Sequence, residues 1–597
     1  MPPRTAVFRT QGSQDGQEVK TSGFEMFKTL KYFRYKTILV LTFLFSMLMG
    51  AITVVMMIYM GDLTSAFGSD PTKTIPELMT PFILKMTWWN IAQVVVMAIA
   101  MSFRSFATPT FNLDLRRAIF TSLMNQPIEY FDKTSAGVLV SRLSEDVTLV
   151  RETYIDKTCT VLQGLTQAVM GVIMAFVNSS LVSLIILVAI PIILITFWLG
   201  ETFVDSLWTE FNEHSTTAAS KAEEVITQFR TVKAFDGEMK EFDDYSKSLD
   251  GIDTVYRKTA IAHGTKDAII TLIANMVTVC VLYMVTYLII KRPTRGIKSG
   301  DAMTIMMYLM MATMGITQAF ASVEDYRNAN TSAAKILEII NLKPDIDRHA
   351  GNELKEVKGK IEFRDVGFKY ASRDQWAVRH LSFTIEPGET VALVGESGCG
   401  KTTTLSLLQR FYEIVEGQIL LDDVDITSLS PVFLRSQISI VPQTPVLFTM
   451  SIADNIRYGR PQSTDDEIAK AAEVGNAHNF IMTIKNNYKE EVQQTSLSGG
   501  QKQRICISRA ILADAPILLL DEATAALDTE SEQLVQQSLE RVRKGKTAIV
   551  VAHRLATVKN ADRILVFQNG AIAESGKHDE LVAKGGIYAN LVKFQLQ

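Results

Sequence analysis

The most chemically specific stretch of the sequence is a glycine-rich run that ends in lysine and threonine. Residues 395–402 read GESGCGKT, after the apolar run ETVALV and before the helical run TTTLSLLQRFY. Glycines let backbone N–H groups turn toward phosphate oxygens, and a following helix N-terminus adds positive potential. The pattern predicts a nucleotide phosphate site in which lysine contacts the β and γ phosphates and threonine holds Mg²⁺. The predicted binding residues are Gly395, Ser397, Gly398, Cys399, Gly400, Lys401, Thr402 and Thr403.

A pair of acidic residues lies about 120 residues downstream, at the end of the run ILLLDE that begins at Ile517. Four apolar residues predict a buried parallel strand, with Asp521 at its end. Asp521 is expected to hold the Mg²⁺ shell, and Glu522 to orient or deprotonate the attacking water. Cys399, within the glycine-rich run, is interpreted as a small spacer, and a regulatory thiol is the alternative.

The overall composition is the average of an apolar first half and a more charged second half. The 597 residues are 47% hydrophobic and 21% charged, with a net charge of −4 and four cysteines. This charge offers no bulk basic surface, so no nucleic-acid partner is expected. The few cysteines exclude a secreted scaffold built on disulfides.

The first half carries six apolar segments long enough to cross a bilayer, and residues 343–597 carry none. They are residues 37–59, 83–101, 161–177, 181–199, 268–290 and 302–320. Helical patterns fill the long stretches between the second and third and between the fourth and fifth segments. The predicted fold is therefore multi-domain: a six-helix, all-α transmembrane domain with long cytoplasmic helical extensions, followed by an α/β P-loop ATPase domain.

Domain boundaries follow from these shifts in composition. We expect a polar N-terminal tail over 1–25, a transmembrane domain over 26–342, a linker over 343–359 and a nucleotide-binding domain over 360–597. Lys28, Lys31, Arg34 and Lys36 precede the first apolar segment, which predicts a cytosolic N-terminus and ATPase domain. The protein is expected to be a multi-pass membrane protein, with the plasma membrane favoured over an organelle membrane.

Further motifs resemble one family. LSGGQ spans residues 497–501, and VGESGCGKTT, LSGGQKQRICISRA, ILLLDEATAALD and VAHRLATV occur in the order typical of ATP-binding-cassette proteins. With the apolar first half, the chain most resembles P-glycoprotein-like multidrug exporters and their half-size relatives. The resemblance implies an ATPase coupled to movement of substances across a membrane, with ATP and Mg²⁺ as cofactors.

The resemblance also implies roles for single residues. Tyr370 matches the aromatic residue that stacks on adenine, Gln443 the residue that reaches Mg²⁺ and water, and His553 the switch histidine that contacts the γ-phosphate. Asp528 matches the D-loop at the dimer seam. The signature residues, which contact ATP held by the other subunit, are Leu497, Ser498, Gly499, Gly500 and Gln501.

Two turns resemble the coupling helices of the family. They contain Tyr130, Phe131 and Asp132 in the first turn, and Ala234, Phe235 and Asp236 in the second. Ordinary helical-hairpin turns are the alternative. The stretch at 492–497 departs from the family pattern because it is two residues shorter and lacks an acidic residue and arginine, and Ala525 replaces the usual serine.

Because the family splits each ATP site between two subunits, the resemblance implies pairing. A C2 homodimer is favoured because every site motif is intact, and a heterodimer is the alternative. The other expected partners are the lipid bilayer and a hydrophobic small-molecule substrate.

The substrate is predicted only from the sixth apolar segment. Its methionines are flexible and polarizable, and such surfaces accept varied ligands. Candidate cavity residues are Met303, Met307, Met310, Met314 and Gln318. The preferred function is a multidrug-type exporter of hydrophobic or amphipathic compounds working by alternating access. The alternatives are a narrow-substrate lipid or peptide exporter, or a non-pumping ATP-sensing regulator.

Overall fold

A computed structural model describes residues 25–66, 75–178, 180–291, 299–348, 350–371, 373–492, 497–522, 529–552 and 558–594. The chain forms two compact units. Unit 1 contains Met1–Phe120 and Val140–Asn341, and unit 2 contains Thr121–Leu139 and Leu342–Gln597. The second unit therefore includes a short piece of the helical half, which the composition shifts did not indicate.

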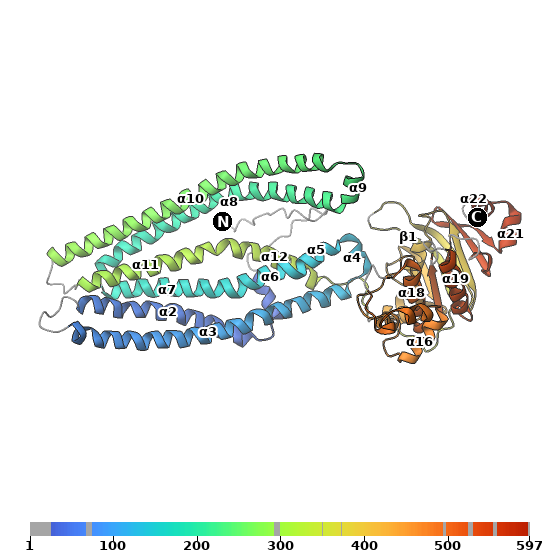
Figure 1. Cartoon of the computed structure of the whole chain (residues 1–597), viewed down its shortest axis with the longest axis horizontal. Helices are drawn as coiled ribbons and strands as arrows, with labels where there is room; N and C mark the ends of the chain where they lie inside the picture. Colours follow the sequence, from blue (N-terminus) through green and yellow to red (C-terminus); the bar gives the residue numbers. More distant parts are fainter. Residues whose placement is uncertain are drawn as a thin grey trace. The chain divides into compact units, whose positions relative to one another are not determined.

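Unit 1 is built from long helices (Figure 1). They are α2 (Lys36–Ala66), α3 (Ile75–Asn125), α7 (Thr158–Asn178), α8 (Ser180–Thr227), α9 (Phe229–Ala234), α10 (Glu238–Lys291), α11 (Ser299–Ala321) and α12 (Val323–Asn341). Between α3 and α7 lie α4 (Ile128–Lys133), α5 (Ala136–Ser141), the π-helical turn η2 (Arg142–Asp146), α6 (Val147–Arg151) and the π-helical turn η3 (Glu152–Lys157). The lengths of α3, α8 and α10 agree with helices that continue well beyond a bilayer.

Five stretches within the described residues are long and apolar enough to cross a membrane. They are Lys36–Asp62, Met79–Asn125, Ala136–Val177, Glu238–Met284 and Thr304–Asn341. These overlap five of the six predicted segments. The remaining segment, 181–199, is helical within α8, and many of its side chains lie outside the described residues.

Two glycines allow a close approach of α7 and α11. A Cβ added at Gly315 of α11 would lie 2.1 Å from the carbonyl oxygen of Gly164 of α7, and one added at Gly164 would lie 2.8 Å from that of Gly315. Small residues allow such backbone contact between membrane helices, where van der Waals packing drives association. The two helices therefore touch backbone to backbone at this crossing.

An N-terminal element was not predicted. Residues Glu25–Lys28 form α1 and Thr29–Tyr32 form the 3-10 turn η1, so helix begins inside the expected polar tail. Met26 is buried, and its backbone N–H donates to Oδ1 of Asn330 on α12 at 3.1 Å. The element is too short to give a periodic apolar signal, and packing on α12 fixes it.

Unit 2 contains two sheets. The four-stranded antiparallel sheet has the order β2-β1-β4-β5 and the six-stranded sheet the order β10-β9-β3-β8-β7-β6. Their strands are β1 (Ile361–Phe368), β2 (Val378–Ile385), β3 (Thr390–Gly395), β4 (Glu416–Leu421), β5 (Val424–Asp425), β6 (Ile438–Val441), β7 (Ile517–Asp521), β8 (Thr547–Val551), β9 (Arg563–Gln568) and β10 (Ala571–Gly576). Strands β9, β3, β8, β7 and β6 are parallel, and β3, β7 and β8 are buried at every residue. Full burial requires helices on both faces of this sheet.

Within Leu342–Gln597 of unit 2, helices and 3-10 turns lie between and after the strands, as expected for an α/β domain. They are α13 (Lys401–Leu408), η5 (Ile426–Ser428), α14 (Pro431–Ser436), α15 (Ile452–Arg457), α16 (Asp465–Val474), α17 (His478–Thr483), η6 (Asn487–Lys489), α18 (Gly499–Ala513), α19 (Thr529–Arg543), α21 (His578–Lys584) and α22 (Ile587–Phe594). Parallel strands with intervening helices place functional loops at the carboxyl ends of the strands.

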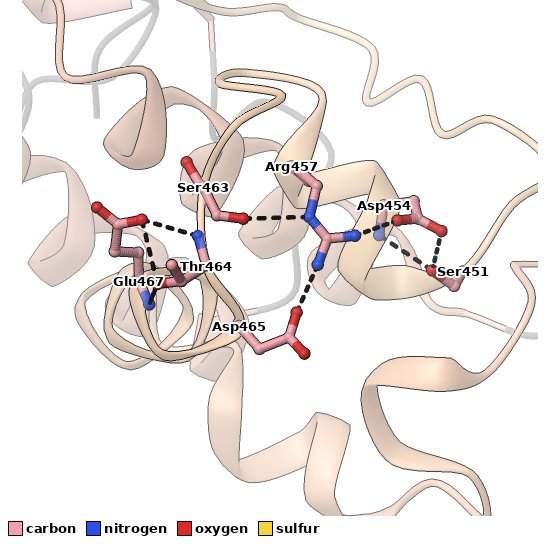
Figure 2. A network of polar contacts seen from close by, with 7 residues as sticks. All are labelled: Ser451, Asp454, Arg457, Ser463, Thr464, Asp465 and Glu467. Atoms are coloured by element: carbon pink, nitrogen blue, oxygen red, sulfur yellow. Dashed lines mark hydrogen bonds and ion pairs between the residues drawn. The ribbon is translucent and has the colours of Figure 1, made fainter.

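A polar network joins α15 to α16 beside the helix α18 (Figure 2). Arg457 contacts the carboxylates of Asp454 and Asp465, and Thr464 forms a capping box with Glu467. The side chain of Asp465 is 90% exposed, so its ion pair adds little to stability. The capping box holds two backbone N–H groups and should matter more.

Thr464→Ala should therefore loosen α16 locally. Loss of an N-cap hydroxyl costs about 1 kcal/mol, which corresponds to a roughly fivefold larger population of the open helix and so to roughly fivefold faster exchange. Native-state hydrogen exchange of amides in 465–474 measures the effect. Thr464→Ser keeps the hydroxyl and should exchange like the unaltered protein; equal exchange in the alanine variant would contradict the assigned cap.

Candidate nucleotide-binding site

The glycine-rich run forms a tight loop between β3 and α13. Gly395 ends the fully buried β3, and Gly398 and Gly400 adopt φ values of 80° and 102°. A Cβ at Gly400 would lie 2.6 Å from the carbonyl oxygen of Ala377, so this position needs glycine for both space and backbone angle. Ser397 and Gly398 are exposed at the loop. The loop thus presents its backbone at the N-terminus of α13, as a phosphate site requires.

Lys401 begins α13 and is buried, with 5% of its surface exposed. Its Nζ donates to the carbonyl oxygens of Gly395 and Glu396, both at 2.8 Å, and lies 3.7 Å from Sγ of Cys399. Cys399 is buried beneath the loop, as expected for a spacer. The two carbonyls hold the ammonium group inside the loop curve, where it can meet a phosphate group.

Two of the three residues predicted for Mg²⁺, Thr402 and Asp521, lie together, and the third, Gln443, contacts Glu522. Oγ1 of Thr402 is 3.3 Å from Oδ1 of Asp521, which ends β7 and is 8% exposed. Hydroxyl and carboxylate oxygens are the hard donors that Mg²⁺ prefers beside phosphate oxygens. This donor set fits Mg²⁺, with Thr402 and Asp521 as its holders. The ion would neutralise charge on the phosphates.

Glu522 follows Asp521 with a left-handed backbone, φ 43°, and its N–H donates to the carbonyl oxygen of Val551 on β8. This conformation is costly for a residue other than glycine and is held by the neighbouring strand. Nε2 of Gln443, which follows β6, donates to Oε2 of Glu522 at 2.7 Å. The sheet order, with β6 beside β7, brings these two residues together from 79 positions apart.

Tyr370 lies two residues after β1 and is half-buried. Its hydroxyl shares a 3.0 Å hydrogen bond with Oγ1 of Thr403 on α13. Its ring packs edge-on against Phe368, with centroids 4.9 Å apart. The ring is therefore fixed beside the phosphate loop, where it can stack on a base.

The signature sequence caps α18. Ser498 is the N-cap, and its hydroxyl accepts a hydrogen bond from the backbone N–H of Gln501. In return, the backbone N–H of Ser498 donates to Oε1 of Gln501. Ser498 and Gly499 are exposed, whereas Gly500 is buried and Leu497 packs on the cluster around α15 and α16. Gln503, which the sequence did not single out, donates to the carbonyl oxygen of Pro442, next to Gln443. This bond ties the signature helix to the Gln443 segment.

Comparison with known proteins decides the family. Residues 39–316 match the family model described as "ABC transporter transmembrane region", and residues 378–525 match the one described as "ABC transporter". ABC transporter B family member 4 of Dictyostelium discoideum is 37% identical over 530 residues, which cover 87% of this chain and 67% of that protein. The chain belongs to the B family of ABC transporters.

Two further B family relatives are similar. Member 1 of Dictyostelium discoideum is 37% identical over 486 residues, covering 81% of this chain and 53% of that protein. Member 19 of Arabidopsis thaliana is 38% identical over 487 residues, covering 81% of this chain and 39% of that protein. The chain spans about half the length, or less, of these two curated relatives.

These matches confirm the predicted family and fold class. The ABC domain implies ATP binding, and the transmembrane region with its apolar helices makes this B family chain a multi-pass membrane protein. Asp528 and His553, assigned by resemblance, lie outside the described residues, as do Ala525 and residues 493–496 of the stretch that departs from the family pattern.

The two segments predicted to be coupling helices differ in environment. Tyr130, Phe131 and Asp132 belong to α4, which lies in unit 2, and Oδ2 of Asp132 accepts from the hydroxyl of Tyr412 at 2.6 Å. Ala234 ends α9 in unit 1, and Phe235 after it is 82% exposed. Asp236 has a φ of 52°, which turns the chain toward α10. An exposed phenylalanine at a helix end suits docking on another surface.

The methionines of α11 share a helix face. Ile305, Tyr308, Ala312 and Gly315 are buried on the face that packs against α7. On the other face, Met310 and Met314 are 50% and 60% exposed, Gln318 is exposed and Met307 is half-buried. The side chain of Met303 lies outside the described residues. Met310, Met314 and Gln318 are therefore exposed away from the buried residues of α11.

Tyr370→Ala should weaken ATP binding. Loss of base stacking costs about 1–3 kcal/mol, which corresponds to roughly 5- to 150-fold in affinity. Tyr370→Phe keeps the ring and should bind ATP within about threefold of the unaltered protein, because it loses only the bond to Thr403. Equilibrium titration with a fluorescent ATP analogue measures both. Equal affinity in the alanine and unaltered proteins would place the adenine elsewhere.

Proposed function

We propose that this chain is one half of an ATP-hydrolysing exporter that moves hydrophobic or amphipathic compounds by alternating access. The observation that carries the proposal is the assembly, after strands β3, β6 and β7 of one sheet, of Lys401, Thr402, Asp521, Gln443 and Glu522. It supplies a charge for phosphate, oxygen donors for Mg²⁺ and a base for water. A protein that only senses ATP has no need of a base that activates water.

In this proposal Glu522 acts as the general base. Gln443 donates to one carboxylate oxygen, Oε2, and so fixes the orientation of the carboxylate. Glu522 can then take a proton from a water aligned with the γ-phosphate. Lys401 stabilises charge on the phosphates, and the loop N–H groups can donate hydrogen bonds to phosphate oxygens.

A second copy of this chain is the proposed partner, in a C2 homodimer. Ser498 and Gly499 lie exposed at the N-terminus of α18, which is an anion-binding end. By resemblance to the family, they would contact ATP bound by the other subunit. ATP binding to the closed dimer would bias the membrane helices toward the outward-facing state, and hydrolysis would reset them. We place the ATPase domain in the cytosol and favour the plasma membrane.

Hydrophobic cargo is proposed from the methionine face of α11. Flexible, polarizable side chains accept ligands of varied shape. Met310 and Met314 are 50% and 60% exposed and Met307 is half-buried, so these side chains can line a path through the membrane. Packing against lipid or another helix is the competing use of this face.

Uptake of the hydrophobic dye rhodamine 6G by inside-out vesicles tests the proposal. We expect ATP-dependent uptake that Glu522→Gln abolishes. ATPase activity in nanodiscs with no uptake of this dye, but uptake of a labelled lipid or peptide, would favour a narrow-substrate exporter. ATP binding without steady hydrolysis would overturn the exporter and favour a sensor.

A further inference from the structure

One hydrogen bond in unit 2 joins the first coupling segment to the nucleotide-binding fold. The hydroxyl of Tyr412 donates to Oδ2 of Asp132 at 2.6 Å. Asp132 lies in α4, and Tyr412 lies four residues beyond the end of α13, 280 positions away along the chain. An O–H to carboxylate bond of this length belongs to the strong, charge-assisted class. The bond is therefore a specific attachment of α4.

The ring of Tyr412 belongs to an aromatic cluster that contains the proposed adenine-stacking residue. Its centroid is 5.3 Å from that of Tyr370, with an interplanar angle of 84°. It is also 5.4 Å from that of Phe368. The pair with Tyr370 is edge-on and the pair with Phe368 is tilted, and aromatic pairs at these distances are favourable. Movement of the Tyr370 ring therefore changes the packing of Tyr412.

The other end of Tyr370 contacts the phosphate loop helix. Its hydroxyl bonds Oγ1 of Thr403, which is buried and lies two residues after Lys401. Contacts therefore run without a break from Thr403 through Tyr370 and Tyr412 to Asp132. All four residues belong to unit 2.

We propose that Tyr412 is a positioning residue that transmits occupation of the nucleotide site to α4 through its hydrogen bond to Asp132. Nucleotide stacking on Tyr370 restricts the ring, the ring restricts Tyr412, and the phenol holds α4 in place. The inference rests on the proposed function only in taking Tyr370 as a nucleotide contact.

The charge state of the phenol supports this role. Burial, together with the hydrogen bond to Asp132 and its negative charge, raises the pKa of Tyr412 above its ordinary value near 10. A phenol with a raised pKa keeps its proton throughout the physiological range, so it remains a donor to the carboxylate. Between about pH 6 and 9 the phenol of Tyr412 should therefore stay protonated and keep donating this hydrogen bond.

Matched variants separate the hydrogen bond from the packing. Tyr412→Phe removes the hydroxyl and keeps the ring against Tyr370. Asp132→Ala removes the acceptor. Tyr488→Phe is the control, because Tyr488 is a partly buried tyrosine of the same unit whose hydroxyl bonds Nδ1 of His478 at 2.8 Å, in another part of the fold.

Hydrogen exchange of the full chain in nanodiscs, with and without Mg²⁺ and the ATP analogue AMP-PNP, provides the readout. In the unaltered protein and in Tyr488→Phe, AMP-PNP should slow exchange in two places, the phosphate loop (395–408) and α4 (128–133). In Tyr412→Phe and Asp132→Ala, the loop should remain protected while the nucleotide-dependent slowing in α4 falls about tenfold, equivalent to about 1.4 kcal/mol. The double variant should show no further loss, because both changes remove one bond.

Two outcomes would overturn the inference: α4 protection that survives in Tyr412→Phe, or additive losses in the double variant. A purely structural role predicts loss of loop and α4 protection together, so it also counts against transmission. Failure of AMP-PNP to protect the loop in the unaltered protein would instead refute the proposed nucleotide site. The two failures are therefore distinguishable.

Discussion

Glu522→Gln is expected to reduce ATP turnover by about 10²- to 10⁴-fold, the contribution of a general base. Glutamine preserves size and the contact with Gln443 but cannot accept a proton from water. Because Lys401, Thr402 and Asp521 are unchanged, ATP should still bind, and the variant should accumulate in the ATP-bound state. Phosphate release in nanodiscs measures turnover, and filter retention of labelled ATP measures occupancy.

Glu540→Gln is the matched control for this variant. Glu540 lies exposed on α19 and contacts Asn560, away from the phosphate loop. Its activity should stay within about twofold of the unaltered protein, as is usual for surface substitutions. Residual turnover above a tenth of normal in Glu522→Gln would assign the base to another group.

Lys401→Ala should weaken ATP binding, the step that precedes hydrolysis. The variant loses the charge that meets the phosphates and leaves the carbonyls of Gly395 and Glu396 without their donor. Hydrogen bonds to charged groups contribute about 1.5–3 kcal/mol, so ATP affinity should fall roughly 10- to 150-fold. Equilibrium dialysis with labelled ATP measures the loss.

The exposed Lys584, at the end of α21, provides the comparison. Lys584→Ala removes the same charge from the same unit and should leave ATP affinity unchanged. If both alanine variants bind ATP equally well, Lys401 has no direct part in nucleotide binding. If Lys401→Ala binds normally but turns over slowly, its role is confined to the transition state.

The phosphate loop was predictable because its chemistry is local. Glycines at 395, 398 and 400 and the adjacent lysine act within eight residues, so the spacing alone specifies the loop. The partnership of Gln443 with Glu522 depends on β6 pairing with β7, which the sequence did not specify. The left-handed backbone of Glu522 was also not visible, because it is imposed by the bond to Val551.

Two other features depended on tertiary packing. The α1 element is buried through Met26 against α12, and four residues carry no helical period of their own. Tyr412 gave no motif signal, because its partners Asp132 and Tyr370 come from distant parts of the chain. The apolar helices, in contrast, were predictable because each needs only length and hydropathy.

The backbone contact between Gly164 and Gly315 has a mechanical consequence. Two helices that touch at this distance cannot slide or rotate past each other without first separating, since no side-chain layer lies between them to re-pack. We therefore expect α7 and α11 to move as one rigid body, so that the methionine face of α11 moves together with α7. Changes in the membrane half during a transport cycle would then occur at contacts other than this crossing.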